Sequence, residues 1–125
     1  MQNTEVRRMF EERCLRFGAG ILKLVGRLTK DPRGKHLADQ LLRSGTSIGA
    51  NIQEAQAAQS RADFVHKMQI SLKEARESAY WLALLREASL TDDAAIPGLI
   101  NECHQIAAIL AQSVITAKSN GRILR

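Results

Sequence analysis

Apolar residues recur at alternating spacings of three and four residues in each quarter of the chain. The first run comprises Phe10, Cys14, Phe17, Ile21, Leu24 and Leu28. Similar runs begin at Leu37, Phe64 and Ile96, and strand-like alternation occurs in none of them. This spacing is typical of helices that pack at a shallow angle, so it predicts an all-α protein of four helices.

Helix-boundary signals separate the four runs. Asp31-Pro32-Arg33-Gly34 predicts a turn after the first helix, because proline prevents the preceding residue from continuing it. Ser60 with Asp63 resembles a capping box that opens the third helix, and Thr91-Asp92-Asp93 is expected to cap the fourth. Short connections make sequential helices antiparallel neighbours, so residues 1–125 should form one up-down-up-down four-helix bundle.

Folding the chain about these turns also predicts which residues share a level. Ser44 should lie level with Ser71, and Cys103 level with Ser78 and Leu28. Cys14 and Cys103 would then be about 20 Å apart along the bundle, too far for a disulfide.

The composition predicts where the protein is located and how its charge is distributed. The chain has 125 residues, 45% hydrophobic and 25% charged, and neither a signal-peptide pattern nor a membrane-spanning run is evident. A cytoplasmic protein with reduced cysteines is therefore expected. Residues 1–43 hold ten Arg and Lys against five Asp and Glu, whereas the rest hold eight of each. All of the net charge of +5 thus lies in the first third.

Much of this charge falls on one face of the first helix and in the loop that follows. We call these residues the basic ridge: Arg16, Lys23, Arg27, Lys30, Arg33 and Lys35. Such a surface can bind phosphate groups of RNA or DNA, but it can equally be an ordinary solvated helix face. No aromatic residue is interleaved with it, so stacking of bases is not supported.

The second helix carries an unusual polar and glycine-rich segment. Gly45 and Gly49 permit close approach of another backbone, and hydroxyl and amide groups lie on or beside the apolar seam. The polar-layer candidates are Arg43, Ser44, Ser47, Asn51 and Glu54, with Ser71 and Glu74 from the third helix. They could line a polar pocket or pore, or form a satisfied layer that fixes helix register. An ion pair between Arg43 and Glu74 is expected.

Tyr80, Trp81 and Leu84 lie beside the third apolar run and exceed what one seam can bury. Exposed aromatic residues with apolar neighbours usually mark an interface, so we expect self-association there. The alternative is that Trp81 only lies over the edge of its own bundle.

No catalytic or metal-binding set is apparent. His36, His66 and His104 lack a well-placed second ligand, and the two cysteines occupy seam positions typical of core residues. We therefore predict no cofactor, no metal and no enzymatic activity.

Residues 42–55, LRSGTSIGANIQEA, and 60–82, SRADFVHKMQISLKEARESAYWL, resemble proteins encoded in intervening sequences of large-subunit ribosomal RNA genes. Accessory proteins of diversity-generating retroelements are relatives of that family. The resemblance implies a bacterial cytosolic four-helix bundle that assembles into a ring-like homopentamer. For the retroelement relatives it also implies a basic surface that engages nucleic acid and a reverse transcriptase. Ala55 departs from the glycine that many members carry after the glutamate matched by Glu54.

Two functions follow as hypotheses. The first is a non-enzymatic oligomer that binds RNA or DNA through the basic ridge. The second is a protein–protein scaffold, with an unnamed protein partner and no nucleic-acid role.

Overall fold

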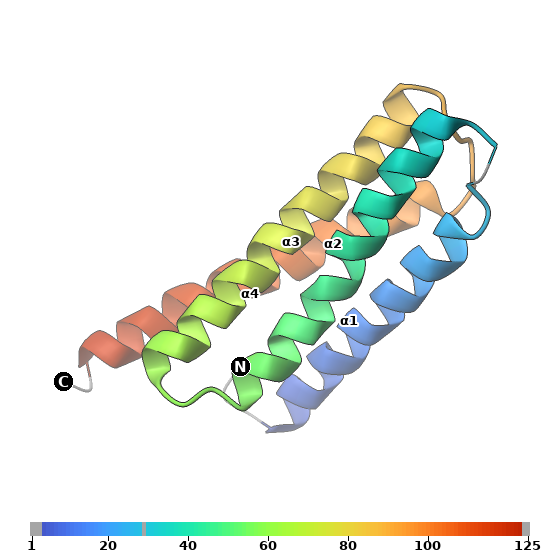
Figure 1. Cartoon of the computed structure of the whole chain (residues 1–125). Helices are drawn as coiled ribbons and strands as arrows, with labels where there is room; N and C mark the ends of the chain where they lie inside the picture. Colours follow the sequence, from blue (N-terminus) through green and yellow to red (C-terminus); the bar gives the residue numbers. More distant parts are fainter. Residues whose placement is uncertain (1–3, 29, 124–125) are drawn as a thin grey trace.

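The computed structural model describes residues 4–28 and 30–123, which fold into four long α-helices (Figure 1). Their bounds are α1 (Thr4–Val25), α2 (Pro32–Gln56), α3 (Arg61–Glu87) and α4 (Ile96–Ile123). The described residues contain no strand. The prediction of an all-α, antiparallel up-down-up-down four-helix bundle is confirmed.

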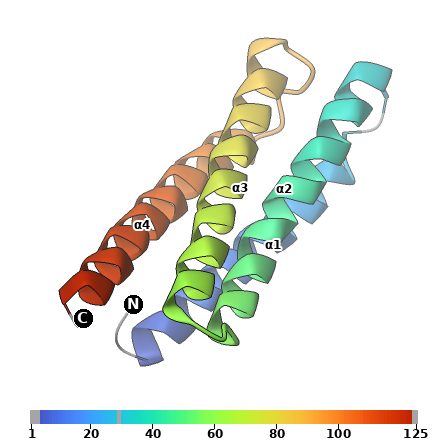
Figure 2. The same cartoon turned by 60° about the vertical axis from the view of Figure 1, so that its left-hand side comes forward.

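Sequential helices lie side by side, and α1 and α4 make the least extensive contact of the helix pairs that pack together (Figures 1 and 2). Two ion pairs bridge this looser seam. Arg13 of α1 donates to Glu102 of α4 at 2.6 and 2.8 Å, and Arg27 reaches Asp93 just before α4. Since α1 and α3 share no direct packing, they lie diagonally across the bundle.

The predicted seam residues of α1 are buried from Phe10 to Leu24, which confirms that part of the pattern. Leu28 is only half-buried and lies beyond the helix. After Val25 the chain tightens, because Arg27 N donates to Leu24 O and Leu28 N donates to Val25 O. These i to i−3 bonds end α1 one turn earlier than the apolar spacing implies.

The helix boundaries follow local capping chemistry. Asp31, expected within a turn, is the N-cap of α2, and Pro32 is its first residue, where a missing N–H is harmless. Ser60 caps α3 as predicted and accepts from Asp63 N at 3.0 Å. Before α4, Thr91 accepts from Asp93 N, and Asp93 in turn accepts from Ala95 N.

The predicted level of Ser44 with Ser71 is wrong. Ser44 accepts from Ser78 Oγ at 2.8 Å, whereas Ser71 donates to Ile48 O, one turn further along α2. The reason lies in the connection, where Ala57 N donates to Glu54 O and Ala58 N to Ala55 O. The chain therefore reverses later than a symmetric fold about the turn assumes.

The predicted separation of Cys14 and Cys103 along the bundle axis is also wrong, although both thiols are free. Arg13 contacts Glu102, so Cys14 and Cys103, their respective neighbours in sequence, occupy similar levels. Small errors at each reversal had accumulated across the chain, including the long connection between Glu87 and Ile96. Both cysteines are buried free thiols.

Candidate nucleic-acid interface and apolar groove

Three members of the basic ridge extend from the outer side of α1 and from the loop after it. Arg16, Lys23 and Lys30 are exposed, because the opposite side of the helix is buried in the core. Within the described residues, none of the three has a carboxylate within ion-pairing distance. Arg16 and Lys23 are two helical turns apart, about 10 Å, so they form an extended rather than a convergent site.

Two other members of the ridge are held in ion pairs. Arg27 donates to both carboxylate oxygens of Asp93, at 2.6 and 3.0 Å. Arg33 similarly donates to both carboxylate oxygens of Asp31, at 2.6 and 3.1 Å, and lowers the pKa of that carboxyl group to about 2. The positive charge of both arginines is therefore locally neutralised. Asp93 lies 66 residues from Arg27 in sequence, so helical spacing could not have revealed this partner.

Lys35 has a weaker partner, since its Nζ lies 3.5 Å from Asp39 one turn along α2 and both side chains are exposed. Exposed pairs of this kind contribute little and exchange readily with solvent. The structure thus divides the ridge into an unpaired set, Arg16, Lys23 and Lys30, and a paired set.

The polar layer is narrower than the sequence suggested. Ser44, Ser71 and Ser78 are completely buried, and each hydroxyl is hydrogen-bonded. A buried, satisfied serine cluster between α2 and α3 favours a structural layer over a pocket.

The remaining polar-layer candidates serve local roles. Ser47 donates to Arg43 O, and Asn51 donates to Ser47 O, so both side chains bond to their own helix. Arg43 pairs with Glu74 at 3.2 Å, as predicted, and also with Glu77. Glu54 lies apart from the layer and binds Lys67 at 3.0 Å.

The structure separates the three candidate interface residues. Tyr80 is 60% exposed, whereas Trp81 and Leu84 are half-buried. Trp81 packs against the core, and its Nε1 donates to Glu77 at 3.2 Å. The Trp81 and Tyr80 rings make a T-shaped contact, with ring centroids 5.4 Å apart and planes at 67°. Tyr80 is therefore an exposed aromatic ring beside a half-buried one.

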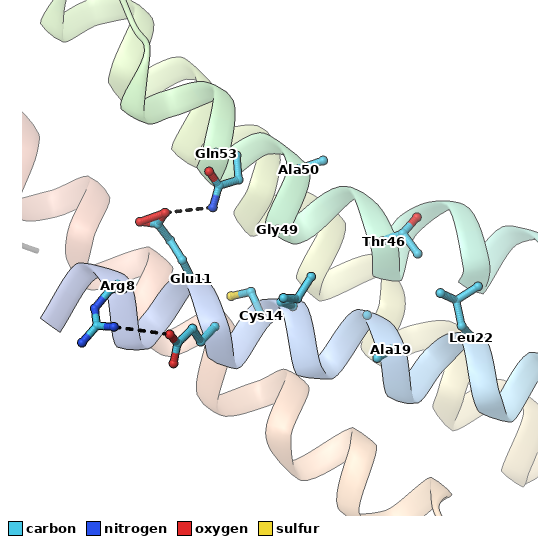
Figure 3. Close-up of a pocket in the computed structure, with 12 residues that line it drawn as sticks. Arg8, Glu11, Cys14, Ala19, Leu22, Thr46, Gly49, Ala50 and Gln53 are labelled. Carbon is cyan, nitrogen blue, oxygen red and sulfur yellow. Dashed lines mark hydrogen bonds and ion pairs between the residues drawn. The ribbon is translucent and has the colours of Figure 1, made fainter. Parts of the chain in front are cut away.

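An apolar groove lies between α1 and α2, a feature that the spacing of the buried seam does not predict (Figure 3). Its volume is ≈ 530 Å³, and Leu15 and Leu22, 72% and 56% exposed, stand on its α1 side. Small residues form much of the remaining lining: Gly18, Ala19, Thr46, Gly49 and Ala50. Leu15 and Leu22 are seven residues apart and off the buried seam, a spacing that marks a second apolar stripe on α1.

Polar side chains occupy one end of this groove. Glu11 accepts from Gln53 at 2.8 Å across the two helices, and Arg8 lies 3.8 Å from Glu12 (Figure 3). The groove therefore combines an apolar centre with a polar end that includes two carboxylates.

Comparison with known proteins identifies the family of this chain. The sequence model of the family described as 23S rRNA-intervening sequence protein matches residues 10–112. The chain belongs to this family. No curated protein matches the chain.

A solved structure supports the assignment to the 23S rRNA-intervening sequence protein family. It is a protein of unknown function from the S23 ribosomal protein family of Bacteroides thetaiotaomicron VPI-5482. The two chains are 38% identical with a TM-score of 0.79, and the match covers 86% of this chain and 96% of that one.

The two cysteines of this family member are buried in the core. Burial raises the pKa of both the Cys14 and Cys103 thiols to about 12, so both are protonated at neutral pH and poor nucleophiles. Within residues 4–28 and 30–123, no group of three or more His, Cys, Asp or Glu side chains is placed to hold a metal ion. None of the described helices is long and apolar enough to cross a bilayer.

Proposed function

We propose that this chain is a non-enzymatic, self-associating helical bundle that binds the phosphates of RNA or DNA through Arg16, Lys23 and Lys30. The family name, which refers to an intervening sequence of 23S rRNA, makes structured RNA the natural first probe. The resemblance to retroelement accessory proteins also supports nucleic acid as the partner.

The observation that carries this proposal is the unpaired state of those three exposed cations. The other described cations in the first third of the chain are each held in an ion pair, as Arg27 is by Asp93. Arg16, Lys23 and Lys30 instead project a net positive field from one edge of the bundle. Copies of the chain in an oligomer would repeat this edge, and their fields would add.

Binding of this kind has a calculable salt dependence. Contacts from three cations to duplex phosphates give a slope of log K against log salt of about −2.7 for each chain. Raising the salt fourfold should then weaken binding by about 40-fold. The test is fluorescence anisotropy of a labelled structured RNA and a matched DNA duplex, titrated with protein at two salt concentrations.

Matched charge reversals locate the surface. Lys30→Glu should weaken binding and make the salt slope about 1 unit shallower, because one phosphate contact is lost. Lys118→Glu changes the net charge equally on an exposed part of α4 away from the ridge and should leave the slope unchanged. Equal losses for the two variants would show that only net charge matters. Absence of binding at low salt would refute the proposal and favour a protein–protein scaffold.

A further inference from the structure

We propose that the α1–α2 groove of one copy receives the outer face of α3 from a second copy, with Tyr80 seated beside Ala19 between Leu15 and Leu22. This inference rests on the self-association included in the proposed function and specifies the two surfaces that meet.

The groove presents an apolar surface to solvent. Leu15 and Leu22 are long apolar side chains more than half exposed, and Ala19 lies between them on the same face. A contiguous apolar hollow of this kind is typical of an interface rather than of a solvated surface. The small side chains of Gly18 and Ala19 leave room for a large ring to approach the α1 backbone.

The outer face of α3 is the surface proposed to enter the groove. Lys73, Arg76, Tyr80 and Glu87 are all exposed and fall within one arc of the helix. The Tyr80 ring lies in edge contact with the Trp81 ring and is 60% exposed on this face. Among the described ion pairs, none involves Lys73, Arg76 or Glu87, so these charges are available to a partner.

Charge determines the direction in which α3 lies in the groove. Exposed positions 12 and 19 on α1 and 26 just beyond it advance in steps of seven residues, as do 73, 80 and 87 on α3. With the two helices parallel and Tyr80 at Ala19, Lys73 meets Glu12, while Glu87 falls level with the uncharged Gly26. The first contact pairs opposite charges, and the second brings no like charges together.

The reversed direction would place like charges together. With Tyr80 still at Ala19 and α3 antiparallel, Glu87 would meet Glu12 and Arg76 would meet Lys23. Like-charge contacts of this kind disfavour the arrangement. The charges on the two surfaces therefore favour the parallel direction.

The parallel contact joins two different surfaces, so it determines the symmetry of the assembly. Since α1 and α3 run in the same direction within one bundle, the parallel contact joins copies that share one polarity. Ala19 and Tyr80 lie on α1 and α3, which are diagonal in the bundle, so each copy can receive one neighbour and donate to another. Such a heterologous contact extends beyond a dimer and either closes into a ring or continues as a filament.

Two blocked variants test the contact. Ala19→Arg fills the groove, and Tyr80→Asp removes the ring, so each variant alone should run as a single chain of 13.8 kDa in size-exclusion chromatography with light scattering. Each still carries one intact surface, so an equimolar mixture should form a complex of two chains and stop there. Ile115→Arg, a change at a 57% exposed α4 residue outside both surfaces, is the matched control and should assemble like the wild type.

A charge swap provides a second test that does not depend on the apolar residues. Glu12→Lys should weaken assembly, and addition of Lys73→Glu should restore it. Circular dichroism must show that each variant keeps the helical content of the wild type.

Several outcomes would overturn the inference. A monomeric wild type would refute self-association altogether, and the RNA titration would still decide the phosphate surface separately. Blocked variants that remain assembled would show that other faces form the oligomer. A mixture of the two blocked variants that stays monomeric would exclude the groove-to-α3 contact.

Discussion

Gly45 offers the sharpest test of how α1 and α2 are packed. A Cβ atom added at this position would lie 2.9 Å from Ile21 Cγ1 and 3.1 Å from its Cγ2. Ile21 is fully buried and β-branched, so its side chain has little freedom to move away. The Gly45→Ala variant must therefore separate the two helices or distort Ile21.

The expected size of the effect is a difference between two opposing contributions. Alanine stabilises a helix interior by about 1 kcal/mol relative to glycine. Overpacking of a dense core costs about 1–3 kcal/mol. The Gly45→Ala variant should thus lose up to about 2 kcal/mol in free energy of unfolding, and a loss of 1 kcal/mol lowers Tm by about 3–5 °C in a domain of this length.

Gly49, one turn along the same helix, is the matched control. Its added Cβ would lie 3.7 Å from Cys14 Cβ, which is an ordinary van der Waals contact. Gly49→Ala should therefore gain most of the helix propensity, about 1 kcal/mol. Urea unfolding followed by far-UV circular dichroism, repeated at two protein concentrations, measures both variants. If Gly45→Ala proves as stable as Gly49→Ala, the close approach at Ile21 is wrong.

Three further outcomes are expected. In the native protein, Cys14 and Cys103 should resist iodoacetamide at pH 8, because burial raises both pKa values, whereas urea should make both reactive; labelling is read by mass spectrometry. Arg13 lowers the pKa of Glu102, so the pair stabilises the fold above the unfolded pKa of about 4.3 and loses this effect as pH falls through the lower folded value. Acid titration should therefore destabilise wild type more than Glu102→Gln. Ser78→Ala should cost about 1 kcal/mol in urea unfolding, because a buried hydroxyl pair is lost.

The fold could be predicted from sequence because its signals are local. The spacing from Phe10 to Leu24 defines a buried stripe within one helix, and Ser60 caps α3 through a bond to a residue three positions away. Neither inference requires knowledge of where another helix lies. Relative heights are different, since they add the geometry of every connection, and the expected level of Ser44 with Ser71 failed for that reason.

The candidate surfaces were less predictable because each depends on two elements. Arg27 belongs to the basic ridge by its helical angle, yet Asp93 from the start of α4 neutralises it. The groove likewise needs both α1 and α2. Its only sequence signal was the seven-residue step from Leu15 to Leu22. This step can be recognised only after the residues of the buried stripe have been assigned to the core.

These surfaces make α1 the element on which assembly and phosphate binding meet, and one variant separates the two effects. Ala19→Arg adds a cation next to Lys23, so a purely local account of charge predicts tighter RNA binding. If binding instead depends on several copies presenting Arg16, Lys23 and Lys30 together, loss of assembly removes multivalency, which can contribute 10²- to 10⁴-fold. RNA affinity should then fall despite the added positive charge. Lys30→Glu should show the converse behaviour, with an unchanged oligomer mass and weaker binding. Tighter binding by a monomeric Ala19→Arg protein would establish that a single ridge suffices and that assembly serves another purpose.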